Sequence, residues 1–258
     1  MTVLDLRAVR YRYPGAGRDA LAGVTASVRA GELVSIVGAN GSGKSTLMKL
    51  LARVVEPIDG DVAFRGRSLA EWSARDYAQR VGYLAQEAEA VFPMRVLDVV
   101  LTGRAPFLGR FEWESERDVE RARRALEECD VAAFEQRFLD AMSGGERKRV
   151  ELARVLAGEP ELVLLDEPLA ALDLAHAQQL ARLLRSIARS DGRTVLFVSH
   201  DLNWSAALAD RMIVLREGRV AADGPPSEIV REEGIRAWFD LDAAVVEVEG
   251  RPWVVPRA

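Results

Sequence analysis

The chain has 258 residues, of which 49% are hydrophobic and 29% are charged, and its formal net charge is −5 at pH 7. These proportions are typical of globular proteins and exclude a disordered or collagenous chain. The negative net charge argues against a general nucleic-acid binder, and we expect no nucleic-acid partner.

The single cysteine, Cys129, permits no internal disulfide, and two histidines disfavour a histidine-rich metal site. We therefore expect a reducing, cytoplasmic compartment. Because no apolar stretch reaches 18 residues, we expect no membrane span. If the protein works at a membrane, other chains hold it there.

The first thirty residues alternate loosely between apolar and polar positions, which is typical of antiparallel strands. A compact apolar run at 33–37 then leads into a glycine-rich segment at 38–46. After it, leucines and a methionine recur at helical spacing over 47–51. The pattern predicts a strand, a glycine loop and a helix in succession.

The glycine-rich segment matches the P-loop pattern Gly38-x-x-x-x-Gly43-Lys44-Ser45. The glycines allow successive backbone N–H groups to face an anion, and the following helix adds its positive end. Lys44 can reach the outer phosphates, and the Ser45 hydroxyl can take one place on Mg²⁺. An ordinary Gly/Ser turn is disfavoured by the flanking strand and helix. The candidate nucleotide-binding residues here are Gly38, Asn40, Gly41, Ser42, Gly43, Lys44, Ser45 and Thr46.

Residues 88–158 contain no convincing strand pattern and are interpreted as an inserted helical subdomain. Ser115 and Asp118 have the spacing of a helix start within it. The segment therefore differs in kind from the strand-rich sequence on either side.

A second helix start in this segment carries two glycines. Ser143 and Glu146 have capping-box spacing, with Gly144 and Gly145 between them. Each glycine inside a helix costs about 1 kcal/mol relative to alanine, which suggests close approach of the backbone to another group. An anion at the helix N-terminus is one interpretation, and a simple well-capped helix is the other.

Two later apolar runs, 162–165 and 194–198, flank a helical pattern over 172–188, which predicts parallel strands joined by a helix. Asp166 and Glu167 follow the first run. Asp166 is then placed to reach Mg²⁺, and Glu167 to orient or deprotonate a water. Two solvated carboxylates are the alternative, which the upstream P-loop disfavours.

Two hairpins are predicted near the end of the chain. Residues 212–221 have the pattern of a closing hairpin, and 243–255 alternate around Gly250.

Several of these segments together resemble an ATP-binding cassette (ABC) ATPase. In chain order they are the P-loop, Ser143-Gly144-Gly145-Glu146, Leu165-Asp166-Glu167-Pro168 and Val198-Ser199-His200-Asp201. The resemblance covers nearly the whole chain. It implies an α/β fold of the P-loop NTPase class, a RecA-like core with an N-terminal antiparallel β subdomain and an inserted α-helical subdomain.

The resemblance also implies a division of the chain into three parts. The ATP-binding core with its β subdomain would comprise 1–87 and 159–225, and the helical signature subdomain 88–158. A C-terminal extension of a helix and a hairpin would comprise 226–258.

The resemblance assigns roles to single residues. Tyr13 would stack on adenine, and Gln86 would contact Mg²⁺ and sense the transporter. Asp173 matches the D-loop, and His200 would hold the γ-phosphate and the attacking water. The implied catalytic residues are Glu167, His200 and Gln86, and the implied Mg²⁺ ligands are Ser45, Gln86 and Asp166. The alternatives are an exposed aromatic, a surface glutamine and a capping histidine.

The helix that Ser143 opens would contact ATP bound to a second copy of the chain. Two copies would then form a two-fold, head-to-tail dimer around ATP, which hydrolysis would release. The cofactors that the resemblance implies are ATP and Mg²⁺.

Within the family, residues 99–106 and 200–203 resemble ATPases of importers for iron–siderophores, haem and cobalamin, and 253–256 weakly resemble the haem branch. The implied partners are membrane-spanning permease subunits and, indirectly, an extracytoplasmic solute-binding protein. The implied location is the cytoplasmic face of the cell membrane. Residues 169–171, Leu-Ala-Ala, replace a more usual stretch containing threonine and serine, and leave the catalytic groups untouched.

A permease would dock on the helical subdomain near Gln86. The residues that could line this groove, or equally form an ordinary subdomain core, are Phe92, Pro93, Met94, Phe107, Leu108 and Phe111. The alternative functions are a soluble ABC ATPase that acts on DNA or ribosomes, an ATPase for another solute, and a regulator that does not hydrolyse ATP. The regulator is disfavoured by the intact Lys44, Asp166, Glu167 and His200.

Overall fold

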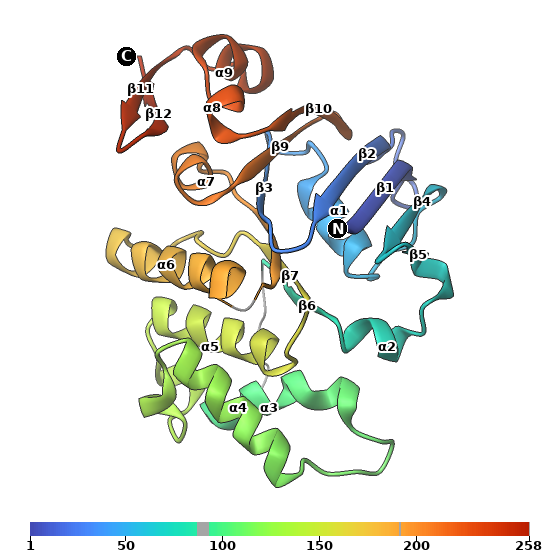
Figure 1. The fold of residues 1–258 in the computed structure, drawn as a ribbon, viewed down its shortest axis with the longest axis vertical. Helices are drawn as coiled ribbons and strands as arrows, with labels where there is room; N and C mark the ends of the chain where they lie inside the picture. Colours follow the sequence, from blue (N-terminus) through green and yellow to red (C-terminus); the bar gives the residue numbers. More distant parts are fainter. Residues whose placement is uncertain (87–92, 191, 258) are drawn as a thin grey trace.

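The computed structural model describes residues 1–86, 93–190 and 192–257 (Figure 1). Its central sheet has six strands among these residues, in the order β10-β9-β3-β8-β7-β6. The strands are β3 (Leu33–Val37), β6 (Val81–Leu84), β7 (Leu162–Asp166), β8 (Thr194–Val198), β9 (Arg211–Arg216) and β10 (Arg219–Gly224). All neighbours pair in parallel except β9 and β10, which form the predicted hairpin. Every residue of β3, β7 and β8 is buried, which explains their unbroken apolar sequences.

An antiparallel sheet lies against the first. Its order is β2-β1-β4-β5, from β1 (Thr2–Tyr11), β2 (Leu21–Arg29), β4 (Asp59–Phe64) and β5 (Arg67–Ser68). Helix α1 (Lys44–Leu51) shares one apolar core with both sheets, in which Leu4, Phe64, Met48 and Ile36 are fully buried. The predicted N-terminal antiparallel subdomain is therefore confirmed, and β4 and β5 extend it beyond the first thirty residues.

Helices gather below the central sheet in Figure 1. α3 (Val96–Leu101), α4 (Glu116–Glu128) and α5 (Gly144–Ala157) pack against one another, and α6 (Leu174–Ser190) packs against α5 and β8. Within the described part of 88–158, the only extended pairing is an isolated bridge between Arg95 and Phe138. The shorter helices before and within this region are η1 (Leu69–Glu71), α2 (Ala74–Ala78), η2 (Thr102–Phe107), η3 (Ala132–Phe134) and η4 (Leu139–Ala141).

Both predicted helix starts carry a complete capping box. The Ser115 side chain accepts from the backbone of Asp118, whose carboxylate accepts from the backbone of Ser115. Ser143 and Glu146 form the same reciprocal pair at the start of α5. Each pair satisfies two backbone N–H groups that the helix itself leaves without partners.

The C-terminal part consists of two short helices and a hairpin. These are α8 (Pro226–Ile229), α9 (Glu232–Phe239), β11 (Ala243–Val248) and β12 (Arg251–Pro256), and the hairpin was predicted. The hairpin packs on α7 (Leu202–Leu208): Asn203 Nδ2 donates to the carbonyl of Val254 at 3.1 Å, and the Val254 N–H donates to Asn203 Oδ1 at 2.7 Å. No helix among the described residues is long and apolar enough to cross a membrane.

Candidate nucleotide-binding site

The glycine-rich loop joins the carboxyl end of β3 to the start of α1. Gly38 has φ 154°, and a Cβ on it would lie 2.2 Å from the carbonyl oxygen of Leu215 on β9. Gly43 has φ 105°, and a Cβ there would lie 2.5 Å from the carbonyl oxygen of Ala20. Any side chain at either position would collide with backbone, so the tight approach of this loop to its neighbours requires both glycines.

Lys44 is the first residue of α1 and is only 5% exposed. Its ammonium donates to the carbonyl oxygens of Gly38 at 2.8 Å and Ala39 at 3.0 Å, so it crosses the mouth of its own loop. Burial lowers the pKa of this lysine. The hydroxyl of Ser42 is buried in the same loop without a hydrogen-bond partner among the described residues. The loop thus holds a cation and a buried hydroxyl suited to an oxyanion.

Asp166 ends β7 beside this loop and is 1% exposed. The Ser45 hydroxyl donates to Asp166 Oδ1 at 3.2 Å. Burial raises the pKa of Asp166, which the hydrogen bond from Ser45 partly offsets. Burial also raises the pKa of Tyr83, on the neighbouring strand β6, to about 12.

The Glu167 carboxylate contacts two further residues of the predicted site, Gln86 and His200. Gln86 Nε2 donates to Glu167 Oε2 at 3.1 Å, and His200 Nε2 lies 2.5 Å from Glu167 Oε1. Glu167 has φ 54°, an uncommon value for a residue with a side chain, at the sharp bend after β7. The bend turns its carboxylate towards the ends of β6 and β8, where Gln86 and His200 follow the strands.

The oxygen atoms in this cluster suit a magnesium ion. Ser45 offers a hydroxyl and Asp166 a carboxylate that are already in contact. Gln86 donates through its amide nitrogen, which leaves its amide oxygen available. Hydroxyl, carboxylate and amide oxygens are the ligands that hard divalent cations prefer, so these side chains fit the ion.

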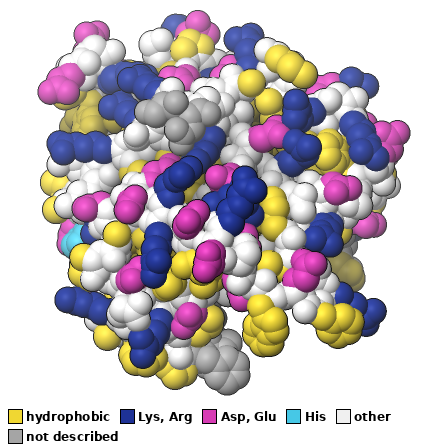
Figure 2. All heavy atoms as spheres, turned by 60° about the horizontal axis from the view of Figure 1, so that its bottom comes forward, with side chains coloured by type: hydrophobic (Ala, Val, Ile, Leu, Met, Phe, Trp, Pro, Cys, Tyr) yellow, Lys and Arg dark blue, Asp and Glu magenta, His cyan; other side chains and the backbone are white. Residues whose placement is uncertain are grey.

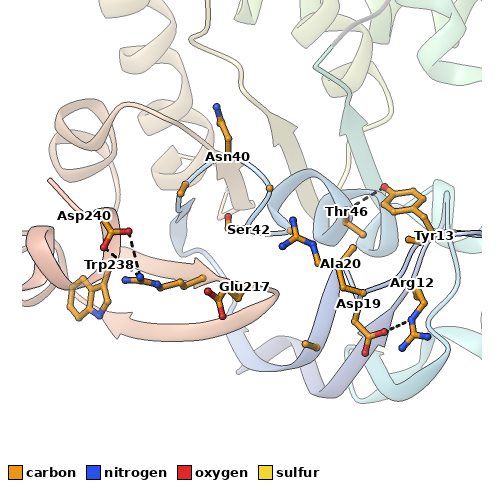
Figure 3. Close-up of a pocket in the computed structure, with 17 residues that line it drawn as sticks. Arg12, Tyr13, Asp19, Ala20, Asn40, Ser42, Thr46, Glu217, Trp238 and Asp240 are labelled. Carbon is orange, nitrogen blue, oxygen red and sulfur yellow. Dashed lines mark hydrogen bonds and ion pairs between the residues drawn. The ribbon is translucent and has the colours of Figure 1, made fainter.

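A pocket of about 710 Å³ opens beside the loop (Figure 3). Tyr13 lies at one end, 39% exposed, with its hydroxyl 3.3 Å from the Thr46 hydroxyl and its ring edge-to-face with Tyr11. Asn40, Gly41, Ser42 and Gly43 also line the pocket. One open space therefore adjoins both the predicted adenine-stacking residue and the predicted phosphate loop.

Residues that the sequence analysis did not single out also line this pocket. The polar and aromatic ones are Arg12, Arg18, Asp19, Arg216, Glu217, Trp238 and Asp240. In Figure 3, Trp238 and Asp240 lie at the end opposite Tyr13. They follow the loop by some 200 positions in the sequence, and no local pattern marked them.

The other predicted nucleotide-binding residues lie elsewhere. Among the described residues that line the 710 Å³ pocket, none comes from 143–146 or from Asp173. Ser143 and Glu146 bond to each other at the start of α5, which lowers the pKa of Glu146 chiefly through the Ser143 N–H. Asp173 bonds to His176. One chain thus carries two separate groups of predicted residues.

A second pocket, of about 360 Å³, lies beside the first group. Glu167, His200, Leu172 and Leu174 are among the residues that line it. Leu174 is 78% exposed, so an apolar side chain lies at the surface next to Asp173.

The residues expected to line a permease groove differ in their burial and contacts. Met94 packs against the main core, and Phe107 stacks under the buried Arg104 at 3.7 Å from its guanidinium carbon. Pro93 is exposed and Leu108 is half-buried. Phe111 is 90% exposed, as is Trp113 at 87%. Phe92 lies outside the described residues.

Comparison with known proteins agrees with this geometry. The family model described as ABC transporter matches residues 21–170. The hemin import ATP-binding protein HmuV of Streptomyces coelicolor is 48% identical over 89% of this chain and 81% of its own length. That of Rhodococcus jostii is 42% identical over 98% of this chain and 87% of its own.

Two solved structures extend the likeness. A metal-chelate type ABC transporter in an inward-facing conformation has a TM-score of 0.87 at 27% identity, covering 100% of this chain and 98% of that one. A dimeric ATP-binding cassette bound to ADP and Pi has a TM-score of 0.74 at 28% identity, covering 86% and 98%. This chain therefore belongs to the ABC transporter family, as one of its nucleotide-binding ATPases.

Proposed function

We propose that this protein is the ATP-hydrolysing subunit of an importer for a metal chelate of the haem, iron–siderophore or cobalamin type. The observation that carries the proposal is the 48% identity to a hemin import ATP-binding protein along 89% of the chain. The likeness of the whole chain to a cassette of a metal-chelate type transporter supports it.

ATP would occupy the 710 Å³ pocket, with adenine on Tyr13 and its phosphates in the loop. The buried Ser42 hydroxyl and the Lys44 ammonium would exchange their present surroundings for phosphate oxygens. Ser45, Gln86 and Asp166 would hold Mg²⁺, which when bound offsets the negative charge of the phosphates.

Glu167 would act as the base that orients and deprotonates the attacking water. Its carboxylate oxygens already contact Gln86 and His200, so both side chains would lie beside the attacking water. His200 has a side chain that is 45% exposed, which allows it to reach a ligand outside the protein core.

The active form would be a head-to-tail dimer. Residues 143–146 and Asp173 do not line the pocket of their own chain, so a second copy would bring them to its ATP. Dimeric cassettes among the similar structures support this arrangement. ATP would join the two copies, and hydrolysis would let them separate.

Membrane-spanning permease subunits would hold the dimer at the cytoplasmic face of the membrane, with a solute-binding protein on the other side. The exposed Phe111 supports a docking surface on the helical part. On the face in Figure 2, basic and acidic side chains are interspersed with apolar ones. The three-part division, with 1–87 and 159–225 as core, 88–158 as helical subdomain and 226–258 as extension, is part of this proposal.

Co-purification from native membranes tests the proposal. A tagged chain should retain a polytopic permease after mild detergent extraction, and vesicles containing the complex should accumulate a metal chelate only with ATP. The Lys44→Ala chain in the same complex serves as the control and should transport nothing. Recovery of ribosomes or DNA in place of a permease would contradict the proposal.

A further inference from the structure

His176 contacts both Asp173 and the start of α5 at residues 143–146, the two segments that the proposed function places against the second copy of the chain. Its Nδ1 lies 2.8 Å from Asp173 Oδ2, and its backbone N–H donates to Asp173 Oδ1 at 2.9 Å. Both contacts fix the Asp173 carboxylate at the start of α6, and the backbone bond lowers its pKa. Asp173 therefore cannot turn without breaking bonds to His176.

The other side of the imidazole lies against α5. A Cβ built on Gly145 would stand 2.3 Å from His176 Cδ2, 2.5 Å from Cγ and 2.9 Å from Cβ. The neighbouring Gly144 has nothing within 4 Å of its own Cβ position. Gly145 is buried whereas Gly144 is exposed. Within this chain, only the second of the two glycines is required by a neighbour, and that neighbour is the ring of His176.

We infer that His176 is a positioning residue that holds Asp173 and the start of α5 at a fixed spacing, so that both segments meet the second copy as one unit. The inference rests on the proposed function, because it assumes that these segments act on nucleotide bound by the partner. Because Gly145 has no Cβ, the His176 ring packs directly against the backbone of α5. The hydrogen bonds to Asp173 hold the ring in this position. Movement of one segment is thereby transmitted to the other.

Two substitutions of the histidine separate this role from general stabilisation. His176→Ala removes the ring atoms that touch Gly145 and the donor to Asp173. His176→Asn keeps Cβ, Cγ, an atom at the Cδ2 position and a donor at the Nδ1 position. Gln178→Ala, at an exposed position on the same helix, is the matched control.

The measurements are the ATP affinity of the dilute single chain, kcat, and ATP-dependent dimerisation in the Glu167→Gln background. We expect His176→Ala to leave ATP affinity unchanged and to lower kcat and dimer affinity about tenfold, the effect of one lost charge-assisted bond. His176→Asn and Gln178→Ala should remain near the wild type. If His176→Ala dimerises and turns over like the wild type, or if His176→Asn is as defective as His176→Ala, the inference is wrong.

A double-mutant cycle tests the contact itself. Gly145→Ala should cost more dimer affinity in the wild-type background than in His176→Ala, where the two closest atoms, Cδ2 and Cγ, are gone and only Cβ remains, at 2.9 Å. Equal costs in both backgrounds would overturn the inference while leaving the proposed function intact. A wild-type chain that binds no ATP would instead overturn both.

Discussion

Glu167 Oε1 and His200 Nε2 lie 2.5 Å apart, across the carboxyl ends of two neighbouring parallel strands, β7 and β8. Both residues follow the last position of their strand closely, so the pairing of Asp166 with Val198 determines their spacing. The parallel pairing of β7 and β8 thus places the Glu167 carboxylate next to the His200 imidazole. The contact links the proposed base for hydrolysis to the residue that would meet the γ-phosphate.

Glu167→Gln should abolish ATP turnover while allowing ATP-bound dimers to accumulate. Glutamine preserves the size of the side chain and can still contact Gln86 and His200, but it cannot accept a proton from water. Steady-state ATPase assays and size-exclusion chromatography with and without ATP check this result. Normal turnover by the variant would remove Glu167 from the proposed role.

Lys44→Ala should lower ATP affinity about tenfold or more, because phosphate oxygens lose a charge-assisted donor. Among the described residues the lysine bonds only to carbonyls of its own loop, so the fold should persist. Isothermal titration with ATP measures the change. Arg7→Ala, at an exposed arginine paired with Asp5, should bind as the wild type does. Unchanged affinity in Lys44→Ala would contradict the phosphate site.

The activity of the isolated chain should depend on its own concentration. If each site needs Ser143 and its neighbours from a second copy, the ATPase rate per chain falls as the dimer dissociates on dilution. A dilution series from well above to far below micromolar concentration provides the measurement. A constant rate per chain would show that one copy suffices.

Gly144→Ala should separate folding from assembly. Because nothing lies within 4 Å of the new methyl, the helix gains up to about 1 kcal/mol in propensity and the free energy of unfolding should not fall. ATP-dependent dimerisation and turnover should nevertheless be reduced, since the methyl would face the partner's nucleotide. Thermal unfolding and the dimerisation assay together test this. Full activity would place Gly144 outside the interface.

Asp118 should make the stability of the helical region sensitive to acid. The Ser115 hydroxyl, which donates at 2.6 Å, and Arg104 lower the pKa of Asp118 from 3.8 to about 2. Because the folded pKa lies below the unfolded one, the carboxylate stabilises the fold above pH 3.8, and this contribution is lost as the pH falls towards 2. Urea unfolding at pH 7 and pH 3 measures the loss.

Asp118→Asn should destabilise the protein by about 3 kcal/mol at neutral pH, because it leaves the Arg104 charge buried without its carboxylate. Arg104 is 1% exposed, so water cannot replace the partner. Asp130→Asn, whose carboxylate is 96% exposed beside Arg149, is the matched control and should change little. Equal effects of the two substitutions would contradict the role of burial.

The sequence predicted those elements that depend on interactions between residues a few positions apart. The strand before the P-loop, the two capping boxes and both hairpins were identified because apolar runs, cap residues and turns act over a few positions. Strand β4 was missed, since it pairs with β1 residues about fifty to sixty positions earlier, and β5, which pairs with β4, was missed with it. The family resemblance supplied Tyr13, Gln86 and His200, which no spacing distinguishes from surface residues.

Tertiary contacts account for the rest. The ring of His176 on Gly145 joins two helices that are separate in the sequence, and neither helix pattern encodes the other's position. Trp238 and Asp240 reach the pocket only because the segment after β10 folds back beside the P-loop. The place of such residues in a site can be recognised only from the folded structure, because their local sequence pattern does not indicate it.

The placement of β3 has a consequence for biosynthesis. Both of its neighbours, β8 and β9, come from residues 194–216, more than 150 positions downstream. A growing polypeptide therefore carries an unpaired apolar segment at 33–37 until most of the chain has left the ribosome. Newly made protein should depend on chaperones during that interval, and fragments that stop before residue 194 should aggregate.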